Sequence, residues 1–457
     1  MYALGFDIGT TNIAGVLLNL EDGTVAKTVT VKNDSAVKAG SEGADGLFAM
    51  QDVAVIAART FELFDVLAVD VGLDKIASIG FTGQMHGIVY LDVNRNPVSH
   101  LITWQDRRGN ALFDGRRTYA EHASKVTGCN LSAGYGAVTY FYDSLNGLVP
   151  EDAVAVSTVY DYIAGVLGGV TENIAHPGSA ASIGLYDIKK NRFDEKAIKK
   201  LGLDFSFFPE IAEEYTVLGK AAGLVPVTVG IGDNQASFIG AVRDFKRSVL
   251  VNVGTGSQVS VVTDRVRKAD GIEIRPFVDG SYLAVGSALC GGKSLGVLAD
   301  LVKDIASRAG STDIDPYELI KASVPAGNSP SPLSVDTRFS GSRKSPMQTG
   351  SITNITPGSL TLENLSAGFC DGISRELSDL YKTLTALTGP RPLIVGSGGG
   401  IKKNPALSAR TARDFSGGSF TLSPIEEEAA AGAALYGACG AGLFKDVQEA
   451  TQFFNSK

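Results

Sequence analysis

A short stretch near the middle of the chain combines two glycines with a carboxylate. Gly230 and Gly232 follow a β-branched run, and Asp233 stands where an apolar, helix-like run begins. Glycine lets the backbone turn sharply and lets a ligand come close. Asp233 could simply cap the helix. Alternatively, it is a carboxylate held at the carboxyl end of a strand, where α/β sheets bind ligands.

A second candidate site follows the first predicted strand, Tyr2 to Ile8. Backbone amides and hydroxyls of Gly9-Thr10-Thr11-Asn12 could cradle a phosphate, although glycine and asparagine also favour a plain hairpin turn. Asp7 favours the phosphate, because a carboxylate inside an apolar strand is costly to bury unless it is paired or binds a cation. A Mg²⁺ ion bridged by water to phosphates would fit beside it.

The same pattern recurs later in the chain. An apolar strand, the turn Gly254-Thr255-Gly256 and another apolar strand span residues 249–262, with Asn252 where Asp7 stood. Two copies of a strand–phosphate-loop–strand unit predict two like-folded domains. Only the first copy keeps a carboxylate for a metal, which predicts divided roles.

Two further glycine runs bear on nucleotide binding. Gly398 to Gly400 lack side chains where something flat must lie close, and an adenine ring or ribose is the natural candidate, although a flexible loop has the same composition. Pro405 then starts a helix. Gly291-Gly292-Lys293-Ser294 nearly matches a P-loop, but Ser287 stands where that motif needs its first glycine, so we reject this match.

Polar side chains that suit a sugar follow a third strand, 76–81. Gln84, Met85 and His86 stand between glycines, where they would meet a ligand, although a single histidine is more often structural. The only tryptophan, Trp104, stands near Asp106. An indole face suits the apolar side of a sugar and a carboxylate suits its hydroxyls, whereas the alternative is a surface loop whose tryptophan packs inward. Tyr135 lies between two glycines in a loop that leads into a helix.

Composition excludes several classes of partner. The chain has 457 residues, of which 44% are hydrophobic and 20% charged, which predicts two or three folded domains. A net charge of −8 without a long basic run argues against nucleic acid and anionic membranes. The four cysteines show no disulfide or zinc spacing, and the N-terminus resembles no signal peptide. No apolar run approaches the roughly 18 residues of a membrane span. We therefore expect a cytoplasmic protein that acts on small molecules, and a homodimer stays open.

Hydrophobic periodicity predicts the elements that hold these loops. The short charged segment 243–248 is the expected boundary between domains 1–244 and 245–457. We expect helices at 46–69, 158–167, 193–201, 236–242, 295–303, 362–387 and 426–441, a hairpin of 88–92 with 98–103, and two strand-like pieces within the Pro-, Ser- and Gly-rich segment 312–355.

The motifs also follow one another in a set order. They are D-x-G-T-T from Asp7, G-Q-M-H-G from Gly83, W-Q-D-R-R from Trp104, G-D-N-Q from Gly232, N-V-G-T-G from Asn252 and G-G-G-x-x-x-N from Gly398. This ordered set resembles the FGGY carbohydrate kinases over nearly the whole chain. The resemblance implies an α/β fold of two ribonuclease-H-like domains of the actin/hexokinase type, with an active-site cleft between them. It implies sugar and the catalytic base on the first domain, nucleotide mostly on the second, and ATP with Mg²⁺.

The resemblance assigns roles by position. Asp233 matches the family's catalytic base, and Asp7 keeps its place as the metal residue. The implied nucleotide residues are Thr10, Thr11, Asn12, Gly254, Thr255, Gly256, Gly398, Gly399, Gly400 and Asn404. The implied sugar residues are Gln84, Met85, His86, Trp104, Asp106, Tyr135, Asp233 and Asn234.

Within the family, Met85-His86 resembles the ketose kinases, because glycerol kinases carry an Arg-Glu pair there. Segments 99–106 and 282–285 are most similar to sedoheptulokinases, which favours phosphorylation of sedoheptulose to sedoheptulose 7-phosphate. Xylulokinases are similar in G-Q-M-H-G, so D-xylulose is the alternative substrate. Ala137-Val138-Thr139 lacks the Pro-Lys of many xylulokinases, and Gly291-Gly292-Lys293 replaces the usual signature of the second domain. A non-catalytic actin-like ATPase module is the alternative outside the kinases.

Overall fold

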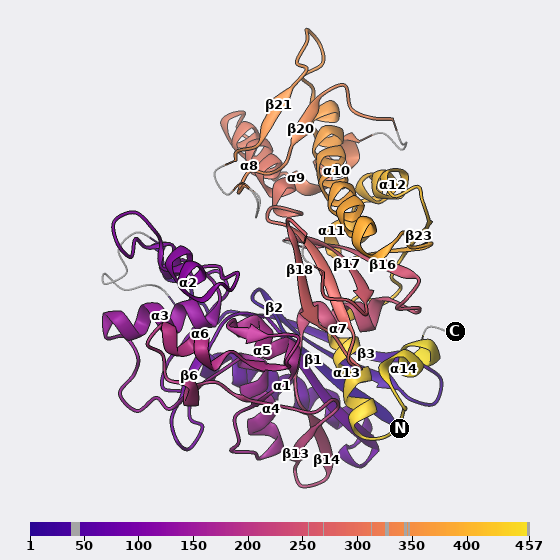
Figure 1. Cartoon of the computed structure of the whole chain (residues 1–457). Helices are drawn as coiled ribbons and strands as arrows, with labels where there is room; N and C mark the ends of the chain where they lie inside the picture. The colour runs from indigo at the N-terminus through magenta and orange to yellow at the C-terminus, as the bar shows by residue number, and fades with distance from the viewer. Residues whose placement is uncertain are drawn as a thin grey trace. The chain divides into compact units, whose positions relative to one another are not determined.

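The computed structural model describes residues 1–457 except 38–45, 255, 268, 312, 325–328, 342–344, 346–347 and 455–457. The chain divides into two compact units (Figure 1). The first comprises Met1–Arg243, Arg275–Gly280 and Glu427–Lys457, and the second comprises Asp244–Ile274 and Ser281–Glu426. The chain first passes from one unit to the other between Arg243 and Asp244, beside the expected boundary near residue 245. The expected division into 1–244 and 245–457 does not include two later segments of the first unit, Arg275–Gly280 and Glu427–Lys457.

The first unit is built on a seven-stranded sheet in the order β13-β14-β5-β1-β2-β3, with β15 also paired to β5. β1, β2 and β3 form an antiparallel meander, whereas β5 runs parallel to β1, and both β14 and β15 run parallel to β5. The strands are β1 (Tyr2–Ile8), β2 (Asn12–Asn19), β3 (Thr24–Lys32), β5 (Ile76–Gly83), β13 (Val217–Ala221), β14 (Val225–Thr228) and β15 (Ile231–Gly232).

Small residues bring the C-terminal helix α13 (Glu428–Gly440) into this first unit. It packs against α7 (Asp233–Ala241), β1 and β5. A Cβ on Gly80 would lie only 1.9 Å from the Ala433 carbonyl oxygen, so the backbones touch almost directly. Figure 1 shows this yellow helix beside the indigo strands of the N-terminus. This close packing explains why residues 427–457 belong to the first unit.

The rest of the first unit surrounds its sheet and a separate hydrophobic cluster around Ile88, Val138 and Phe141. The helices are α1 (Val53–Val71), α2 (Tyr119–Thr127), α3 (Gly136–Asn146), α4 (Val159–Gly168), α5 (Pro177–Ile183), α6 (Glu195–Lys200) and α14 (Val447–Phe454), with short helical turns η2 (Leu73–Lys75), η3 (Arg108–Asn110) and η4 (Phe205–Phe207). Short ribbons pair β4 (Met50–Gln51) with β7 (Leu101–Ile102), β6 (Val89–Leu91) with β8 (Ala155–Ser157), β9 (Ile174–Ala175) with β12 (Glu210–Ile211), and β10 (Tyr186–Asp187) with β11 (Arg192–Phe193).

Two local predictions need correction here. The helix expected from residue 46 begins only at Val53, because the Asp52 side chain accepts hydrogen bonds from Ala54 and Val55 and caps it. The hairpin expected between 88–92 and 98–103 does not form as one ladder, since β6 pairs with β8 and β7 pairs with β4. Only isolated bridges join the two expected arms.

The second unit repeats the central motif of the first. β16 pairs antiparallel with β17 and parallel with β22, as β1 does with β2 and β5. The sheet order is β18-β19-β17-β16-β22-β23. Its strands are β16 (Ser248–Val253), β17 (Ser257–Thr263), β18 (Ile272–Pro276), β19 (Tyr282–Ala288), β22 (Leu393–Ser397) and β23 (Ser419–Leu422), and β20 (Ser334–Asp336) pairs separately with β21 (Ser351–Thr353). The last two residues of β18, Arg275 and Pro276, already belong to the first unit. The predicted internal repeat is therefore confirmed.

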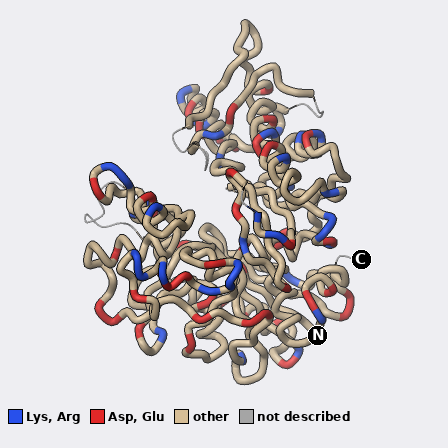
Figure 2. The backbone as a smooth tube through the Cα atoms, in the orientation of Figure 1, with Lys and Arg blue, Asp and Glu red and all other residues tan. Residues whose placement is uncertain are grey.

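The long helix α10 and the short helix α11 pack against this sheet, and the other helices of the second unit pack against α10. The helices of this unit are α8 (Lys293–Arg308), α9 (Pro316–Ser323), α10 (Leu362–Thr388), α11 (Gly399–Lys402) and α12 (Pro405–Asp414). α9 was not predicted within the Pro-, Ser- and Gly-rich segment, and the run from Gly399 starts a helix instead of remaining a loop. No helix in the described part of the chain is long and apolar enough to cross a membrane. Acidic and basic residues are interspersed over both units (Figure 2).

Candidate active site

Three strands of the first unit end side by side and define the site. Asp7 of β1 lies opposite Thr82 of β5, and Ile231 of β15 lies opposite the same threonine on the other side. Gly232 then pairs with Gly83, and Asp233 follows directly. This register brings Asp7 and Asp233 to one carboxyl edge of the sheet, the edge where α/β sheets bind ligands.

Asp233 does not occupy the capping position of α7. The N-cap residue is Gly232, and it provides no side-chain hydrogen bond. The carboxylate of Asp233 instead accepts a hydrogen bond from Nδ2 of Asn234 at 2.8 Å. Burial raises the pKa of Asp233, whereas the Asn234 hydrogen bond and the positive charge of Arg275 act to lower it. The capping interpretation of Asp233 is therefore wrong, and its ligand-binding role stays a prediction.

Asp7 is the second carboxyl group at this edge of the sheet. Its Oδ1 atom has no hydrogen-bond partner among the described residues. Burial raises the pKa of Asp7 to about 8, and the negative charges of Asp233 and Glu427 add to that shift. No cluster of three or more His, Cys, Asp or Glu side chains that could hold a metal occurs in the described part of the chain. Water and phosphate oxygens are ligands that could complete the coordination of a divalent cation at Asp7.

The first predicted phosphate loop is joined to the predicted sugar residues by hydrogen bonds. The Thr10 hydroxyl accepts a hydrogen bond from the Trp104 indole N–H at 2.9 Å and donates one to Gln84 at 3.2 Å. Gln51 connects the same group, since its amide donates to the Thr10 carbonyl and accepts from Gln84. The Thr10 hydroxyl is thus engaged on the sugar side, whereas Thr11 and Asn12 are exposed.

Gln51 is a residue that sequence reasoning missed, because it fell inside the expected helix 46–69. The structure places it on β4, with its side chain buried between two predicted site residues. Trp104 is 44% exposed, which contradicts the alternative of a tryptophan packed inward. A half-exposed indole with its N–H held by Thr10 leaves ring surface that a sugar can contact.

His86 and Tyr135 form a second wall of the site. Their rings stack with centroids 4.5 Å apart. His86 adopts a φ of 74°, uncommon for a residue other than glycine, and its Nδ1 lies 2.8 Å from the Ser182 carbonyl oxygen. A carbonyl only accepts, so Nδ1 carries a proton. A Cβ on Gly134 would lie 2.0 Å from the Trp104 carbonyl oxygen, so the loop before Tyr135 packs directly on the tryptophan loop.

Asp106 requires a correction, because no part of its side chain is exposed. Arg108 donates to both its oxygens, at 2.8 and 3.1 Å, and the Ala49 N–H donates to one of them. Arg108 also pairs with Asp143 on α3 at 2.5 Å, and Tyr90 completes the buried group. Asp106 therefore anchors the tryptophan loop and presents no oxygen to a sugar. Met85 is likewise buried.

The predicted nucleotide residues meet at a pocket of about 490 Å³ in the second unit. Gly254, Gly399, Gly400 and Asn404 line it, and Thr255 lies outside the described residues. Gly256 and Gly398 are not among its lining residues. Gly398 has a φ of 83° and makes the turn into α11, while Asn404 also caps α12. Four of the six described residues predicted for the second-unit nucleotide site are thus brought together.

The segment Gly291-Gly292-Lys293, which replaces the usual signature of the second domain, helps to line the same pocket. The Gly292 N–H donates to the Gly254 carbonyl at 3.1 Å, and a Cβ on Gly292 would lie 2.2 Å from that oxygen. This close approach docks the start of α8 on the second phosphate loop. Other lining residues were missed because α9 was not predicted, although Asp315 before Pro316 is a helix-start signal. The additional polar and charged lining residues are Lys293, Tyr317, Glu318, Lys321 and Lys403.

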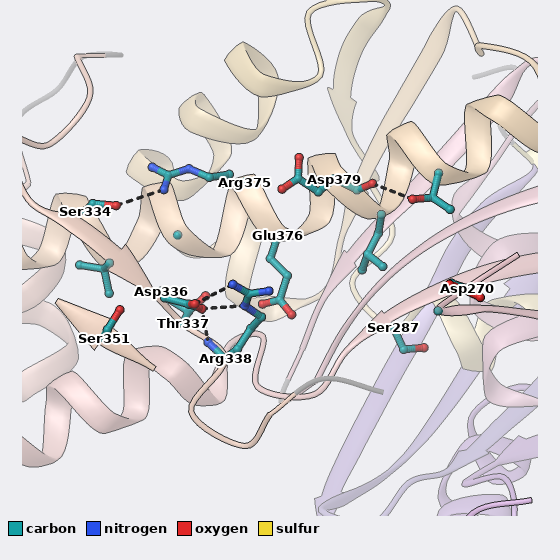
Figure 3. Close-up of a pocket in the computed structure, with 15 residues that line it drawn as sticks. Asp270, Ser287, Ser334, Asp336, Thr337, Arg338, Ser351, Arg375, Glu376 and Asp379 are labelled. Atoms are coloured by element: carbon teal, nitrogen blue, oxygen red, sulfur yellow. Dashed lines mark hydrogen bonds and ion pairs between the residues drawn. The ribbon is translucent and has the colours of Figure 1, made fainter. Parts of the chain in front are cut away.

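A second pocket of about 570 Å³ in the same unit contains no predicted site residue. It lies between α10 and β20, and Figure 3 shows Glu376 facing Arg338. Arg338 is held by Asp336 through hydrogen bonds of 2.8 and 2.6 Å, and Arg375 donates to Ser334. Burial raises the pKa of Glu376 to about 7. Asp336 and Arg338 thus form an ion pair within this pocket.

Comparison with known proteins assigns the family. Residues 2–245 match the FGGY family of carbohydrate kinases, N-terminal domain. The chain belongs to this family. It is 26% identical to the sedoheptulokinase of Mus musculus over 459 residues, which cover 90% of this chain and 92% of that protein. It is 25% identical to the Homo sapiens sedoheptulokinase over the same shares of both chains. A glycerol kinase of Aquifex aeolicus is 25% identical over 74% of this chain and 70% of that enzyme.

Solved structures confirm the fold of this FGGY kinase. A xylulose kinase from Lactobacillus acidophilus matches with a TM-score of 0.82 at 20% identity, covering 99% of this chain and 92% of that one. Plasmodium falciparum glycerol kinase with ADP matches with a TM-score of 0.81 at 18% identity, with the same coverage. The predicted two-domain fold of the actin/hexokinase type is therefore correct. The protein is an ATP-dependent carbohydrate kinase.

Proposed function

We propose that this kinase transfers the γ-phosphoryl group of ATP to a primary hydroxyl of a ketose, and that its substrate is sedoheptulose, giving sedoheptulose 7-phosphate. The observation that carries the proposal is the position of Asp233. It starts α7 without capping it, at the sheet edge that also presents Asp7. A carboxylate held there can orient an attacking hydroxyl and accept its proton.

Each element of the site then has a part in the reaction. The transition state of phosphoryl transfer is loose, so positioning and neutralisation of charge contribute most of the catalysis. Asp7 would hold Mg²⁺ through its partnerless oxygen, and the ion would neutralise charge on the phosphates. Trp104, His86 and Tyr135 give the sugar an aromatic wall, and Gln84 fixes the Thr10 loop beside it. Gly254, Gly399, Gly400 and Asn404 surround the nucleotide, and Lys293, Lys321 and Lys403 attract its phosphates.

The choice of sugar rests on the curated relatives. Both sedoheptulokinases align over nine tenths of this chain, whereas the xylulose kinases support only the fold, at 20% identity. Met85-His86 disfavours glycerol despite the glycerol kinases among the relatives. D-Xylulose is the alternative that a direct test must address. We also propose a cytoplasmic location, in keeping with the four free cysteines.

A panel of sugars tests this assignment. ADP formation is measured with ATP and Mg²⁺ alone and then with sedoheptulose, D-xylulose, D-ribulose or glycerol added. We expect strong stimulation by sugar and the highest kcat/KM with sedoheptulose. A higher kcat/KM with D-xylulose would make the protein a xylulokinase. ADP release that no sugar stimulates would instead support an actin-like ATPase module.

A further inference from the structure

A six-residue segment of the chain is held in the first unit although the chain on both sides of it belongs to the second. This segment, Arg275–Gly280, follows Ile274 and precedes Ser281. Three contacts fix it at its start, middle and end: Gln235 Nε2 donates to the Pro276 carbonyl at 2.9 Å, the Phe277 ring packs edge-on against Phe238, and the Asp279 N–H donates to Glu214 at 3.0 Å. The backbone that carries Arg275 is therefore anchored beside α7.

Arg275 reaches the candidate base through one intermediate side chain. Only 7% of Arg275 is exposed, and its Nη1 donates a hydrogen bond of 2.5 Å to Oδ1 of Asn234. Nδ2 of the same asparagine donates to Oδ1 of Asp233 at 2.8 Å. Nη1 of Arg275 also lies 3.8 Å from the Met85 sulfur, which helps to fix the guanidinium. The three residues form a continuous chain of hydrogen bonds from Arg275 to Asp233.

The chemistry of the three groups allows one orientation of the amide. A guanidinium has five N–H donors and no acceptor, so the oxygen of Asn234 must face Arg275. The amide NH₂ then faces Asp233, whose carboxylate oxygens accept. Without a donor behind it, Asn234 could turn over and present its oxygen to the carboxylate, which would repel it. The positive charge of Arg275 thus selects the amide orientation that holds Asp233.

We propose that Arg275 is a positioning residue for catalysis, which acts through Asn234 to fix the direction of the Asp233 carboxylate. The inference rests on the proposed function of Asp233 as the base. It assigns a catalytic task to a segment that none of the sequence motifs includes. Because the task is orientation, loss of Arg275 affects the rate of the chemical step more than the binding of either substrate.

The first test compares Arg275→Met with Arg275→Lys. Met keeps length and apolar bulk but cannot donate, whereas Lys still donates and has no acceptor. We expect Arg275→Met to lower kcat about ten- to a hundredfold, the cost of a small misplacement of a reacting group. KM for sugar and for ATP should change little, and Arg275→Lys should recover much of the loss. Full kcat in Arg275→Met would overturn the inference, as would an equal loss in both variants.

A double-mutant cycle tests whether Arg275 acts through Asp233. In an Asp233→Asn background there is no base left to position, so Arg275→Met should cause no further loss of kcat. If it lowers kcat by the same factor again, its effect is independent of Asp233 and the inference fails. Where Arg275→Met does not fold, Asn234→Asp provides the same test. It places an acceptor against Asp233 with almost no change in shape, and we expect a comparable loss of kcat, whereas unchanged kcat overturns the inference.

A control separates orientation of Asp233 from general loosening of the segment. Tyr215 donates to Asp279 at the other end of the segment, with 2.9 Å to either carboxylate oxygen. Tyr215→Phe should lower the melting temperature without a matching fall in kcat, and a fall as large as that of Arg275→Met would overturn the inference. Asp233→Asn with full activity would remove the proposed function itself. Asp233→Asn without activity beside a fully active Arg275→Met would remove only this inference.

Discussion

Asp7 and Asn252 occupy the same place in two copies of one structural unit. Asp7 lies opposite Ala14 on the antiparallel neighbour and Thr82 on the parallel one, and Asn252 lies opposite Gln258 and Ser397 in the same way. Nδ2 of Asn252 donates to the Ser397 hydroxyl at 2.9 Å, whereas Oδ1 of Asp7 has no partner in the described part of the chain. The amide of Asn252 therefore has a partner within its own unit, whereas the free oxygen of Asp7 is the one that we propose binds Mg²⁺.

Replacing Asp7 by Asn should abolish this difference and most of the activity. We expect kcat/KM to fall about a hundredfold or more, since the charge of a bound metal contributes several kcal/mol to such reactions. The measurement is the ADP assay over a range of Mg²⁺ concentrations, because the variant should no longer respond to Mg²⁺ at concentrations that saturate the parent. A variant with normal Mg²⁺ dependence would exclude Asp7 as the metal residue.

The same substitution should stabilise the protein in the absence of Mg²⁺ and nucleotide. The folded state raises the pKa of Asp7 from 3.8 to about 8, so folding favours the protonated carboxyl. The resulting loss of stability is absent below pH 3.8, grows as the pH rises, and levels off above about pH 8. Thermal melts should therefore show a larger gain for Asp7→Asn at pH 8 than at pH 5. An equal gain at both values would mean that Asp7 titrates normally.

Replacing Asp233 by Asn keeps the shape of the side chain and removes the negative charge that accepts the proton. We expect kcat to fall at least about a hundredfold, the lower end for a lost general base. Sugar KM and the melting temperature should change little. Steady-state kinetics and a thermal melt of the same preparation provide both values. Since Asn is as good as Asp at helix N-caps, a variant that keeps most of its kcat would return Asp233 to a structural role.

Gly399 tests the nucleotide pocket. A Cβ there would meet no atom within 4 Å, so Gly399→Val should fold while its side chain fills part of the pocket. We expect KM for ATP to rise several times more than KM for sugar. Gly417→Val is the matched control, because a Cβ at Gly417 also meets nothing within 4 Å and the residue does not line the pocket. Equal effects on both substrates, or equal effects of both variants, would place the nucleotide elsewhere.

Asp106→Ala tests the corrected role of the W-Q-D-R-R aspartate. It removes one partner of a buried ion pair and leaves Arg108 partly uncompensated, which costs about 3–5 kcal/mol in comparable cases. We expect a clear drop in melting temperature and in the denaturant midpoint, with sugar KM changed much less. A variant of normal stability with a strongly raised sugar KM would restore the sugar contact expected from the sequence.

Local patterns in the sequence predicted the parts of this protein that depend on neighbouring residues. β1 has the predicted bounds, α10 ends one residue beyond its prediction, and Pro405 opens α12 as expected. Strand alternation, helical periodicity and turn residues act over a few positions, so one sequence suffices to recognise them. The repeat of the phosphate loop and the order of the motifs were readable for the same reason, and they identified the family.

Tertiary structure decided how those parts combine, because the deciding contacts join residues far apart along the chain. The sequence predicts that Asp106 contacts the ligand. In the structure, the guanidinium of Arg108 donates to both oxygens of Asp106 and also pairs with Asp143, which lies 35 positions after Arg108. α13 joins the first unit because Gly80 and Ala433 allow two backbones to touch. Arg275 has no motif of its own, and it reaches Asn234 across 41 positions because the segment after it is anchored beside α7. Residue type set what each group could do, and packing determined which partner it received.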